Sequence, residues 1–355
     1  MEFSQKSPSE QISETMKRVY SMGMTTASGG NISIRKKNGD IWSTPSGVDK
    51  GSLRPEDIVC VKKNSDIQNE FGFGPTSELP SHRAVYRKRK DLNAIIHAHP
   101  SALLTFSIAR KVPNTKIIPQ AYNICGEIGY APYKISGSNA LGVSVSKEFE
   151  KGYNCVVMEN HAIIVGGKCM SEAFQRLETL EYCACTIINS IKLDTYNTLS
   201  TDQIKAFSDR DYDLPEKDDT EHPSDEGEIR NDICKMVKRA YRQKLMISTF
   251  GTVSIRWKGN DFLITPTGVD RQKIDNQDIV QISNGKREMG KYPSRSVRMH
   301  QAIYEKHAHI NSIIISHPPN VLSFCVCGIS VDTSISPESY VLLRNIPLVP
   351  FGKQF

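Results

Sequence analysis

The sequence of 355 residues lacks the features of membrane and secreted proteins. No apolar run approaches the roughly 20 residues that a membrane-spanning helix needs. The first residues, Met1–Lys6, do not carry the apolar stretch of a secretion signal. The nine cysteines form no Cys-x-x-Cys pair, and their odd number and scattered positions fit reduced thiols. We therefore expect a cytoplasmic globular protein without a membrane partner, long enough for two domains.

A concentration of basic charge is also largely missing. The net charge is +6, and the basic residues are spread along the chain apart from the run Arg87–Lys90. We interpret this run as the solvated end of a helix. Because nucleic-acid-binding proteins gather lysine and arginine on one face, the sequence predicts no nucleic-acid partner.

What the sequence does contain is an internal repeat. Four motifs of the first half return in the second half, in the same order and with their spacing kept. They are Gly30–Arg35 and Gly251–Arg256, Thr44–Asp49 and Thr265–Asp270, Asp57–Val59 and Asp278–Val280, and His82–Tyr86 and His300–Tyr304. Self-similarity at so long a period indicates two copies of one domain plan rather than a solenoid.

The stretch from residue 208 to residue 228 is rich in Asp and Glu and almost free of apolar side chains. We expect an acidic linker there, because such a composition cannot contribute to a core. The linker divides the chain into a first domain, 1–207, and a second domain, 229–355. Phe355 corresponds to Gly137 of the first copy, so we expect the second copy to be degenerate and shortened.

Helical and strand patterns alternate in the first copy. We expect helices over 9–22, capped by Ser9, over 77–90, capped by Thr76 or Ser77, and over 171–191. Strands are expected over 31–35, 40–43 and 95–99, and over 156–158 and 161–165 as a strand pair or one bent strand. Strands interleaved with helices predict an α/β or α+β sheet domain.

Two histidines end one of the predicted strands. Alternate side chains of a strand face the same way, so His97 and His99 project side by side. A metal site needs further ligands, and the candidates are His161, beside another predicted strand, and Glu78, near the start of a predicted helix. Two histidines in a strand can also simply pack in the core. The third histidine favours a metal site.

Small polar turns are the second chemical feature. They are Ser28–Asn31, Thr44–Gly47 and Pro75–Ser77. Glycine lets backbone N–H groups approach an anion, and serine and threonine add hydroxyl donors. The third turn opens a predicted helix, whose N-terminus favours a phosphate. Each turn alone is equally well an ordinary turn or cap, but together with a metal site they predict a phosphate-bearing substrate.

The ordered set of these motifs, from Gly30–Asn31 through Ser77–Glu78 and His97–His99 to Asn160–His161, resembles the class II aldolase/adducin family. Within that family the first copy is most similar to the L-fuculose phosphate aldolases. The resemblance covers about residues 9–195, and the second copy in weakened form. It implies a central mixed sheet flanked by helices, in two tandem copies. It also implies a homo-oligomer, a small sugar-phosphate substrate and bound Zn²⁺ or another divalent transition metal.

The resemblance also implies roles for residues of the first copy. His97, His99 and His161 match the zinc ligands, and Glu78 matches a glutamate that is a zinc ligand at rest and a proton-shuttling base during turnover. Tyr122 matches the tyrosine that protonates the aldehyde oxygen in a neighbouring subunit's site. The positions that match phosphate-binding residues are Asn31, Ser46, Gly47, Thr76 and Ser77.

The implied reaction is retro-aldol cleavage of a ketose phosphate, such as L-fuculose phosphate, through a metal-stabilised enediolate. The same platform serves sugar-phosphate epimerases, dehydratases and decarboxylases. A non-catalytic module like the adducin head and a regulatory sugar-phosphate binder are further alternatives. The intact His97, His99, His161 and Glu78 favour a metal-dependent carbon–carbon lyase.

The second copy departs from the pattern at the positions that carry the chemistry. Ile315 replaces His97, Ser296 replaces Glu78, and Thr252 replaces Asn31. Of the four positions of the metal ligands, only that of His99 keeps its residue type in the second copy, as His317, and Tyr340 keeps the place of Tyr122. One histidine cannot hold a catalytic zinc ion, so we expect the second copy to be non-catalytic and to lack the metal site.

Overall fold

The structure is a computed structural model that describes residues 3–63, 74–209, 214–217 and 224–352. The chain forms two compact units, Met1–Ile188 and Asn189–Phe355, and the division between them falls within one long helix, α6. Because the two units are separate bodies, each is described by itself below.

The first unit contains a mixed seven-stranded sheet with the strand order β3-β2-β1-β4-β7-β6-β5. All neighbouring strands pair antiparallel except β5 and β6, which are parallel. The strands are β1 Asn31–Arg35, β2 Ile41–Ser43, β3 Val59–Val61, β4 Ala94–Ala98, β5 Gly129–Ala131, β6 Cys155–Met158 and β7 Ala162–Gly167. The helices are α1 Pro8–Ser21, α2 Leu79–Lys88, α3 Ser101–Ile108, α4 Pro119–Cys125, α5 Asn139–Glu150 and α6 Met170–Leu193.

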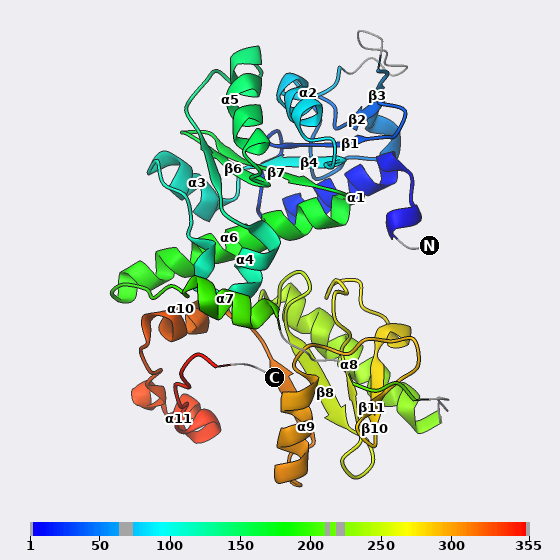
Figure 1. Cartoon of the computed structure of the whole chain (residues 1–355), viewed down its shortest axis with the longest axis vertical. Coiled ribbons are helices and arrows are strands. Elements are labelled where there is room, and N and C mark those ends of the chain that lie inside the picture. Colours follow the sequence, from blue (N-terminus) through cyan, green and yellow to red (C-terminus); the bar gives the residue numbers. More distant parts are fainter. Residues whose placement is uncertain (1–2, 64–73, 210–213, 218–223, 353–355) are drawn as a thin grey trace. The chain divides into compact units, whose positions relative to one another are not determined.

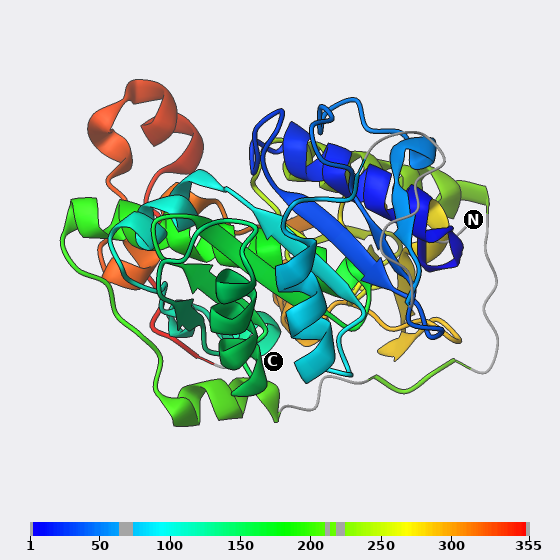
Figure 2. The same cartoon turned by 90° about the horizontal axis from the view of Figure 1, so that it is seen from above.

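Helices cover both faces of this sheet. Figures 1 and 2 show α2 and α5 side by side on one face, and Figure 1 shows α1 and α6 on the opposite side. The central strands β4, β6 and β7 are buried along their whole length, which explains why their sequences read as continuous apolar runs. The predicted layered sheet with flanking helices is confirmed.

The register of the sheet determines where the polar side chains of the strands lie. His97 in β4 pairs with Asn31 of β1 on one side and with Ile164 of β7 on the other. The strand pair expected at 156–158 and 161–165 is present as the antiparallel hairpin β6–β7. This hairpin carries His161 between its strands, next to the end of β4.

The starts of two helices differ from the sequence prediction. Ser7, not Ser9, caps α1, because Pro8 begins the helix and Glu10 closes a capping box with Ser7. The cap of α2 is Glu78, not Thr76 or Ser77, although the Thr76 hydroxyl accepts a hydrogen bond from the Glu78 N–H at 3.3 Å. The third turn therefore presents Glu78 itself at the helix N-terminus.

The second unit repeats half of this plan. Its five-stranded sheet has the order β11-β10-β9-β8-β12, with antiparallel pairing throughout. The strands are β8 Thr252–Arg256, β9 Phe262–Ile264, β10 Val280–Ser283, β11 Lys286–Arg287 and β12 Ser312–Ile315. The helices are α7 Thr201–Ser208, α8 Ser224–Arg242, α9 Val297–Lys306, α10 Pro319–Cys327 and α11 Pro337–Leu343.

The segment expected to be an acidic linker is described only in part. Residues 210–213 and 218–223 lie outside the described residues. Between them, Leu214 is buried and packs in the core of the second unit, and backbone hydrogen bonds link Pro215 and Lys217 to Arg287. The expectation that this segment contributes nothing to a core is wrong at Leu214, because local pairing with β11 carries the Leu214 side chain inward.

Two further features of the structure concern the cysteines and the hydropathy of the helices. All nine cysteines are free. In the part of the chain that the structure describes, no helix combines the length and the hydropathy that crossing a membrane requires.

Candidate metal centre

His97 lies near the end of β4, one of three strands of the first unit that are buried along their whole length. Its Nδ1 is 3.0 Å from the carbonyl oxygen of Ile163. A carbonyl can only accept a hydrogen bond, so Nδ1 carries the hydrogen and Nε2 of the neutral ring presents its lone pair to the site. Such a backbone contact is the usual way in which a metal-binding imidazole is oriented.

His99 follows the end of β4, where its N–H donates to the Met24 carbonyl at 3.0 Å. Two glycines make room for this strand end. A Cβ on Gly29 would lie 3.0 Å from Nδ1 of His99, and one on Gly30 would lie 2.8 Å from the His97 carbonyl oxygen. Gly30 also has a positive φ of 70°, which glycine adopts without strain.

His161 comes from the turn between β6 and β7. The preceding Asn160 adopts the left-handed conformation with φ 51°, which asparagine tolerates better than most residues. The His161 N–H then donates to Met158 O at 3.1 Å and to the Ser107 hydroxyl at 3.0 Å. The hairpin turn thus fixes the third histidine beside β4.

The four predicted ligands come together. One nitrogen from each of His97, His99 and His161 lies within 4.8 Å of the others, and among the described residues this is the sole such group of three metal-ligating side chains. Glu78 lies against two of them, with Oε2 3.1 Å from Nε2 of His97 and Oε1 3.3 Å from Nε2 of His161. The four side chains come from three separate parts of the chain.

Burial and charge act against each other in this group. Burial lowers the pKa of His97 to about 4, although the Glu78 carboxylate works in the opposite direction. Burial also lowers the pKa of His99. For Glu78, burial raises the pKa, but the electrostatic interaction with the His97 imidazole and hydrogen bonds from His161 and Ser136 outweigh it and hold the pKa below its ordinary range. The carboxyl group is therefore ionised at neutral pH.

The donor set fits a divalent transition metal. The Nε2 lone pair of a neutral His97 faces a carboxylate oxygen at 3.1 Å, and two acceptors at that distance need a proton or a cation between them. Three imidazole nitrogens and a carboxylate are ligands that Zn²⁺ accepts, with bonds of about 2.0–2.2 Å. The spacing of the three nitrogens is compatible with a shared ion after small side-chain movements.

Two of the predicted turns lie side by side next to Glu78. The Ser46 N–H donates to Gly74 O and the Thr76 N–H donates to Thr44 O, each at 3.0 Å. Ser46, Gly47 and Ser77 are exposed beside this pairing, whereas Thr76 is buried. The predicted phosphate-binding residues other than Asn31 therefore gather in one place.

Asn31 lies apart from the two turns, within the metal-ligand group. Its Nδ2 donates to Oε2 of Glu78 at 3.2 Å. Its Oδ1 is buried and has no hydrogen-bond partner in the described part of the chain. A buried acceptor without a donor is costly, so this atom is suited to receive a hydrogen bond from a bound molecule.

Sequence reasoning missed two residues of the site. Lys50 is buried, and its ammonium group donates to the carbonyl oxygens of Pro45 at 3.0 Å and Val48 at 3.1 Å. Burial lowers the pKa of Lys50. Ser136 donates a hydrogen bond to Oε1 of Glu78. The signal for Lys50 was a basic residue at the same place in both repeats, since Arg271 follows the second motif.

Tyr122 is not part of this group within the first unit. It lies half-buried on α4, where the Lys116 ammonium is 5.3 Å from the centre of its ring. Among the described residues, no contact joins it to Glu78 or to the three histidines. Its expected place in a neighbouring subunit's site stays a prediction.

Comparison with known proteins agrees with the fold and the site. The family model of the class II aldolase and adducin N-terminal domain matches this chain twice, over residues 10–188 and 231–354. The chain belongs to the class II aldolase and adducin family. The two matches coincide with the two copies of the repeat, so the predicted family is confirmed.

Named relatives in this family act on sugar phosphates. The chain is 35% identical to an L-fuculose phosphate aldolase of Methanococcus maripaludis over 176 residues, which is 49% of this chain and 93% of the relative. It is 27% identical to a 3-oxo-tetronate 4-phosphate decarboxylase of Pectobacterium atrosepticum over 169 residues, 46% of this chain and 76% of the relative. A solved L-fuculose 1-phosphate aldolase superimposes with a TM-score of 0.51 at 25% identity, covering 58% of this chain and 97% of that chain.

The equivalent place in the second unit is built differently. Ser296 caps α9 as Glu78 caps α2, and Ile315 ends β12 at the position of His97. Three hydroxyls bond to one another there, with Thr252 Oγ1 2.6 Å from Ser294 Oγ and 3.3 Å from Ser296 Oγ. These side chains offer no set of metal ligands.

Proposed function

We propose that the first unit is a zinc-dependent sugar-phosphate aldolase that cleaves a ketose phosphate such as L-fuculose phosphate. The observation that carries the proposal is the position of Glu78, which touches His97 and His161 and begins the helix beside the phosphate-type turns. A divalent metal ion held by His97, His99 and His161 supplies a Lewis acid for the carbonyl and hydroxyl oxygens of the substrate.

Glu78 is the residue that moves the proton in this proposal. In the condensation direction, Glu78 removes a proton from the three-carbon phosphate fragment, the electron pair left on that carbon forms the bond to the aldehyde carbon, and the aldehyde oxygen takes up a proton from a general acid. Cleavage reverses both transfers: the hydroxyl group next to the scissile bond returns its proton to that acid, the electron pair of the bond passes to the departing fragment, and Glu78 gives a proton to its carbon. The ionised Glu78 carboxylate can accept a proton at Oε1 or Oε2 and return it. Asn31 supports the same step, because its free Oδ1 can bind a substrate hydroxyl while Nδ2 orients Glu78.

The two turns hold the phosphate in this proposal. Ser46, Gly47 and Ser77 offer exposed hydroxyl and backbone donors, and Thr76 shapes the turn from inside. The buried Lys50 ties the backbone of the first turn together and places a positive charge beneath it. An anion bound above the turn is stabilised by that charge more strongly than in water, because the lysine is shielded from solvent.

The general acid for the aldehyde oxygen is Tyr122 of another copy of the chain in this proposal. Tyr122 has no contact with the ligand group of its own unit among the described residues, so the role requires a homo-oligomer. Tyr122→Phe should then lower turnover without changing metal content.

Decarboxylation is the second candidate, because a relative is a 3-oxo-tetronate 4-phosphate decarboxylase. The identity to the aldolase relative is higher, at 35% against 27%. The two activities are separated by their products, since only the decarboxylase releases carbon dioxide.

The test is a product screen of purified full-length protein supplied with Zn²⁺. Ketose 1-phosphates are assayed for dihydroxyacetone phosphate, and 3-oxo-tetronate 4-phosphate is assayed for carbon dioxide. We expect dihydroxyacetone phosphate from a ketose phosphate, and no activity in His97→Ala. Full activity in His97→Ala would exclude the proposed site. Release of carbon dioxide from 3-oxo-tetronate 4-phosphate, with no cleavage of any ketose phosphate, would replace aldolase by decarboxylase.

A further inference from the structure

A second hollow of the first unit lies away from the metal centre. It has a volume of about 840 Å³ and is lined by the turn between β1 and β2, by β3 and by α2. Eight of its thirteen lining residues are lysine or arginine, and none is acidic. We call it the basic groove. Charge that looked scattered in the sequence is therefore concentrated here by the fold.

Most of these cations are available to a ligand. Arg35 is used by the fold, because it donates to the carbonyl oxygens of Tyr86 and Leu92, each at 2.6 Å. Lys62 is paired with Asp40 at 3.2 Å. Six side chains that line the groove make no ion pair with any described residue: Lys36, Lys37, Lys63, Arg83, Arg87 and Lys90.

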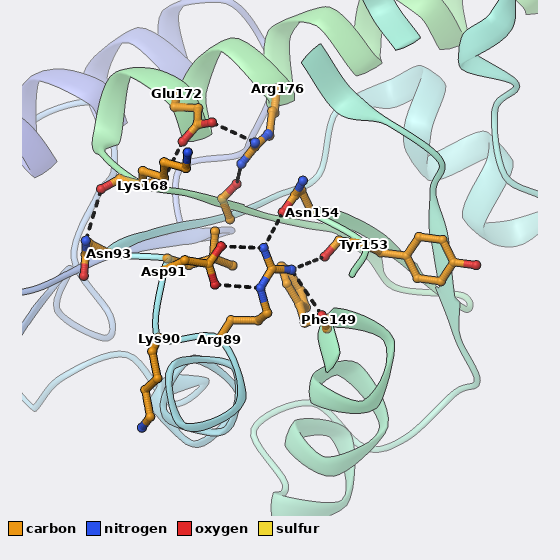
Figure 3. Close-up of polar contacts among 12 residues, drawn as sticks. Arg89, Lys90, Asp91, Asn93, Phe149, Tyr153, Asn154, Lys168, Glu172 and Arg176 are labelled. Carbon is orange, nitrogen blue, oxygen red and sulfur yellow. Dashed lines mark hydrogen bonds and ion pairs between the residues drawn. The ribbon is translucent and has the colours of Figure 1, made fainter. Parts of the chain in front are cut away.

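The four side chains of the basic run at the end of α2 have two roles: two of them bond to other parts of the fold, and two line the groove. Figure 3 shows the guanidinium of Arg89 turned inward, bonded to Asp91 at 2.7 and 2.8 Å and to the carbonyl oxygens of Phe149 and Tyr153 at 3.1 Å. Lys88 pairs with Glu150 at 2.9 Å. Lys90 points away from the Arg89 network in Figure 3 and lines the groove together with Arg87.

The second unit provides an internal control for this charge. The hollow at the same place in its fold has a volume of about 560 Å³ and includes Lys258 but also Asp261 and Glu305. By the alignment of the repeats, Gln301 stands at the position of Arg83 and Glu305 at that of Arg87. The fold is kept without the basic side chains, so folding alone does not require them.

We propose that the basic groove binds one small molecule that carries several phosphate groups. Six cations around one hollow that pair with no described residue favour a ligand of high negative charge, and guanidinium groups match phosphate oxygens in pairs. The volume lies within the roughly 300–1,000 Å³ of small-molecule sites. Single-stranded nucleic acid needs exposed aromatic side chains for its bases, whereas the aromatic lining residue, Tyr86, is 2% exposed and hydrogen-bonded to Ser33.

The experiment is equilibrium dialysis of the full chain with inorganic triphosphate. We expect one equivalent to bind, and much more tightly than orthophosphate. The variant Arg83→Gln with Arg87→Glu introduces the residues of the second unit and should weaken binding by about tenfold or more, because it removes two cations from the groove and adds one negative charge. Lys63→Asn should weaken it by a smaller factor.

A matched control carries the same change of charge outside the groove. Lys17→Gln with Lys147→Glu alters two exposed lysines on α1 and α5 and should leave the affinity within about twofold, because separated surface charges are screened by salt. Triphosphate can also chelate a metal ion bound at the candidate metal centre. That effect is the same in both double variants, so it does not change the comparison of their affinities. Circular dichroism checks that each variant is folded.

Three results would overturn the proposal: no binding beyond that of orthophosphate, equal weakening in both double variants, or tighter binding of an oligonucleotide that Arg83→Gln with Arg87→Glu abolishes. The last result would assign the groove to nucleic acid. Glu78→Gln should leave triphosphate binding unchanged, so the outcome is independent of the proposed aldolase activity.

Discussion

The two units share a scaffold and differ in the side chains placed on it. His99 and His317 both follow a strand. The His99 N–H donates to the Met24 carbonyl and the His317 N–H to the Leu245 carbonyl, each at 3.0 Å. Glu78 and Ser296 cap equivalent helices with nearly the same backbone angles, φ −92° and ψ 7° against φ −88° and ψ 10°. The backbone geometry is therefore the same where the side chains differ.

A buried polar network is also common to both units. Ser33 bonds to His82 at 2.7 Å and to Tyr86 at 2.9 Å, and the same serine, histidine and tyrosine contacts recur in the second unit, at 2.7 Å each. Because this network survives where the metal ligands do not, it serves the fold. A repeat thus separates residues that maintain structure from residues that carry function.

The largest expected effect is on kcat, and it separates the residues that cap the equivalent helices α2 and α9. Glu78→Gln removes the group that transfers the proton and should lower kcat by about 10²–10⁴-fold. Ser296→Ala changes the equivalent cap of the second unit and should leave kcat unaltered. Steady-state kinetics on the ketose phosphate measure both. A comparable loss in Ser296→Ala would show that the second unit takes part in catalysis.

The next comparison is between the two histidines at the strand ends. His99→Ala should reduce bound metal from about one ion per chain to a small fraction, because a catalytic zinc site depends on three protein ligands. His317→Ala should keep the metal content of the unaltered protein. Elemental analysis after dialysis against a weak chelator distinguishes them. Equal metal loss in both would contradict a site confined to the first unit.

Acid should destabilise the second unit through His300. Burial lowers the pKa of His300 to about 4, so below pH 6.5 the unfolded chain binds a proton that the folded chain excludes. Stability is therefore present above pH 6.5 and is lost as the pH falls towards 4, by about 2–3 kcal/mol for this group. Urea denaturation at pH 7.5 and 4.5 should show a smaller acid loss in His300→Gln than in the unaltered protein. His307→Gln, at an exposed histidine, should leave the loss as it was.

The smallest expected effect is on the free energy of unfolding, and we expect it to be similar when the serine of the shared polar network is removed from either unit. Ser33→Ala and Ser254→Ala each leave a buried histidine nitrogen without its hydroxyl partner and should cost about 1–3 kcal/mol of unfolding free energy. Ser21→Ala, at an exposed hydroxyl, should cost much less. Chemical denaturation followed by circular dichroism gives the three values. A large loss in only one unit would show that the network has different roles in the two copies.

The sequence predicted much of the fold because its signals were local. Strand β1 was expected over 31–35 and found there, since apolar and polar side chains alternate between clear turns. Glu78, His97, His99 and His161 were all found from residue type and position relative to predicted elements. Helices α3, α4 and α5 were not predicted, and for α3 and α4 the reason is that short apolar segments carry little helical periodicity.

The remaining residues of the site depend on contacts between distant parts of the chain. Ser136 lies 58 residues from Glu78 in sequence, and nothing in its surroundings marks it. Lys50 looks like a surface lysine in a polar turn until the turn folds over it. The basic groove was missed for the same reason, since its lysines and arginines come from a turn, a strand end and a helix.

The positions of the four ligand residues have a consequence for evolution. Glu78 caps a helix, His99 follows a strand, and His161 occupies a hairpin turn, so three of the four stand where elements end. Single substitutions at such places remove chemistry with little damage to packing. His97, within a strand, is exchanged in the second copy for isoleucine, a residue that strands favour. A duplicated domain of this kind can therefore lose its activity in a few steps while it continues to fold, and it remains available for another use.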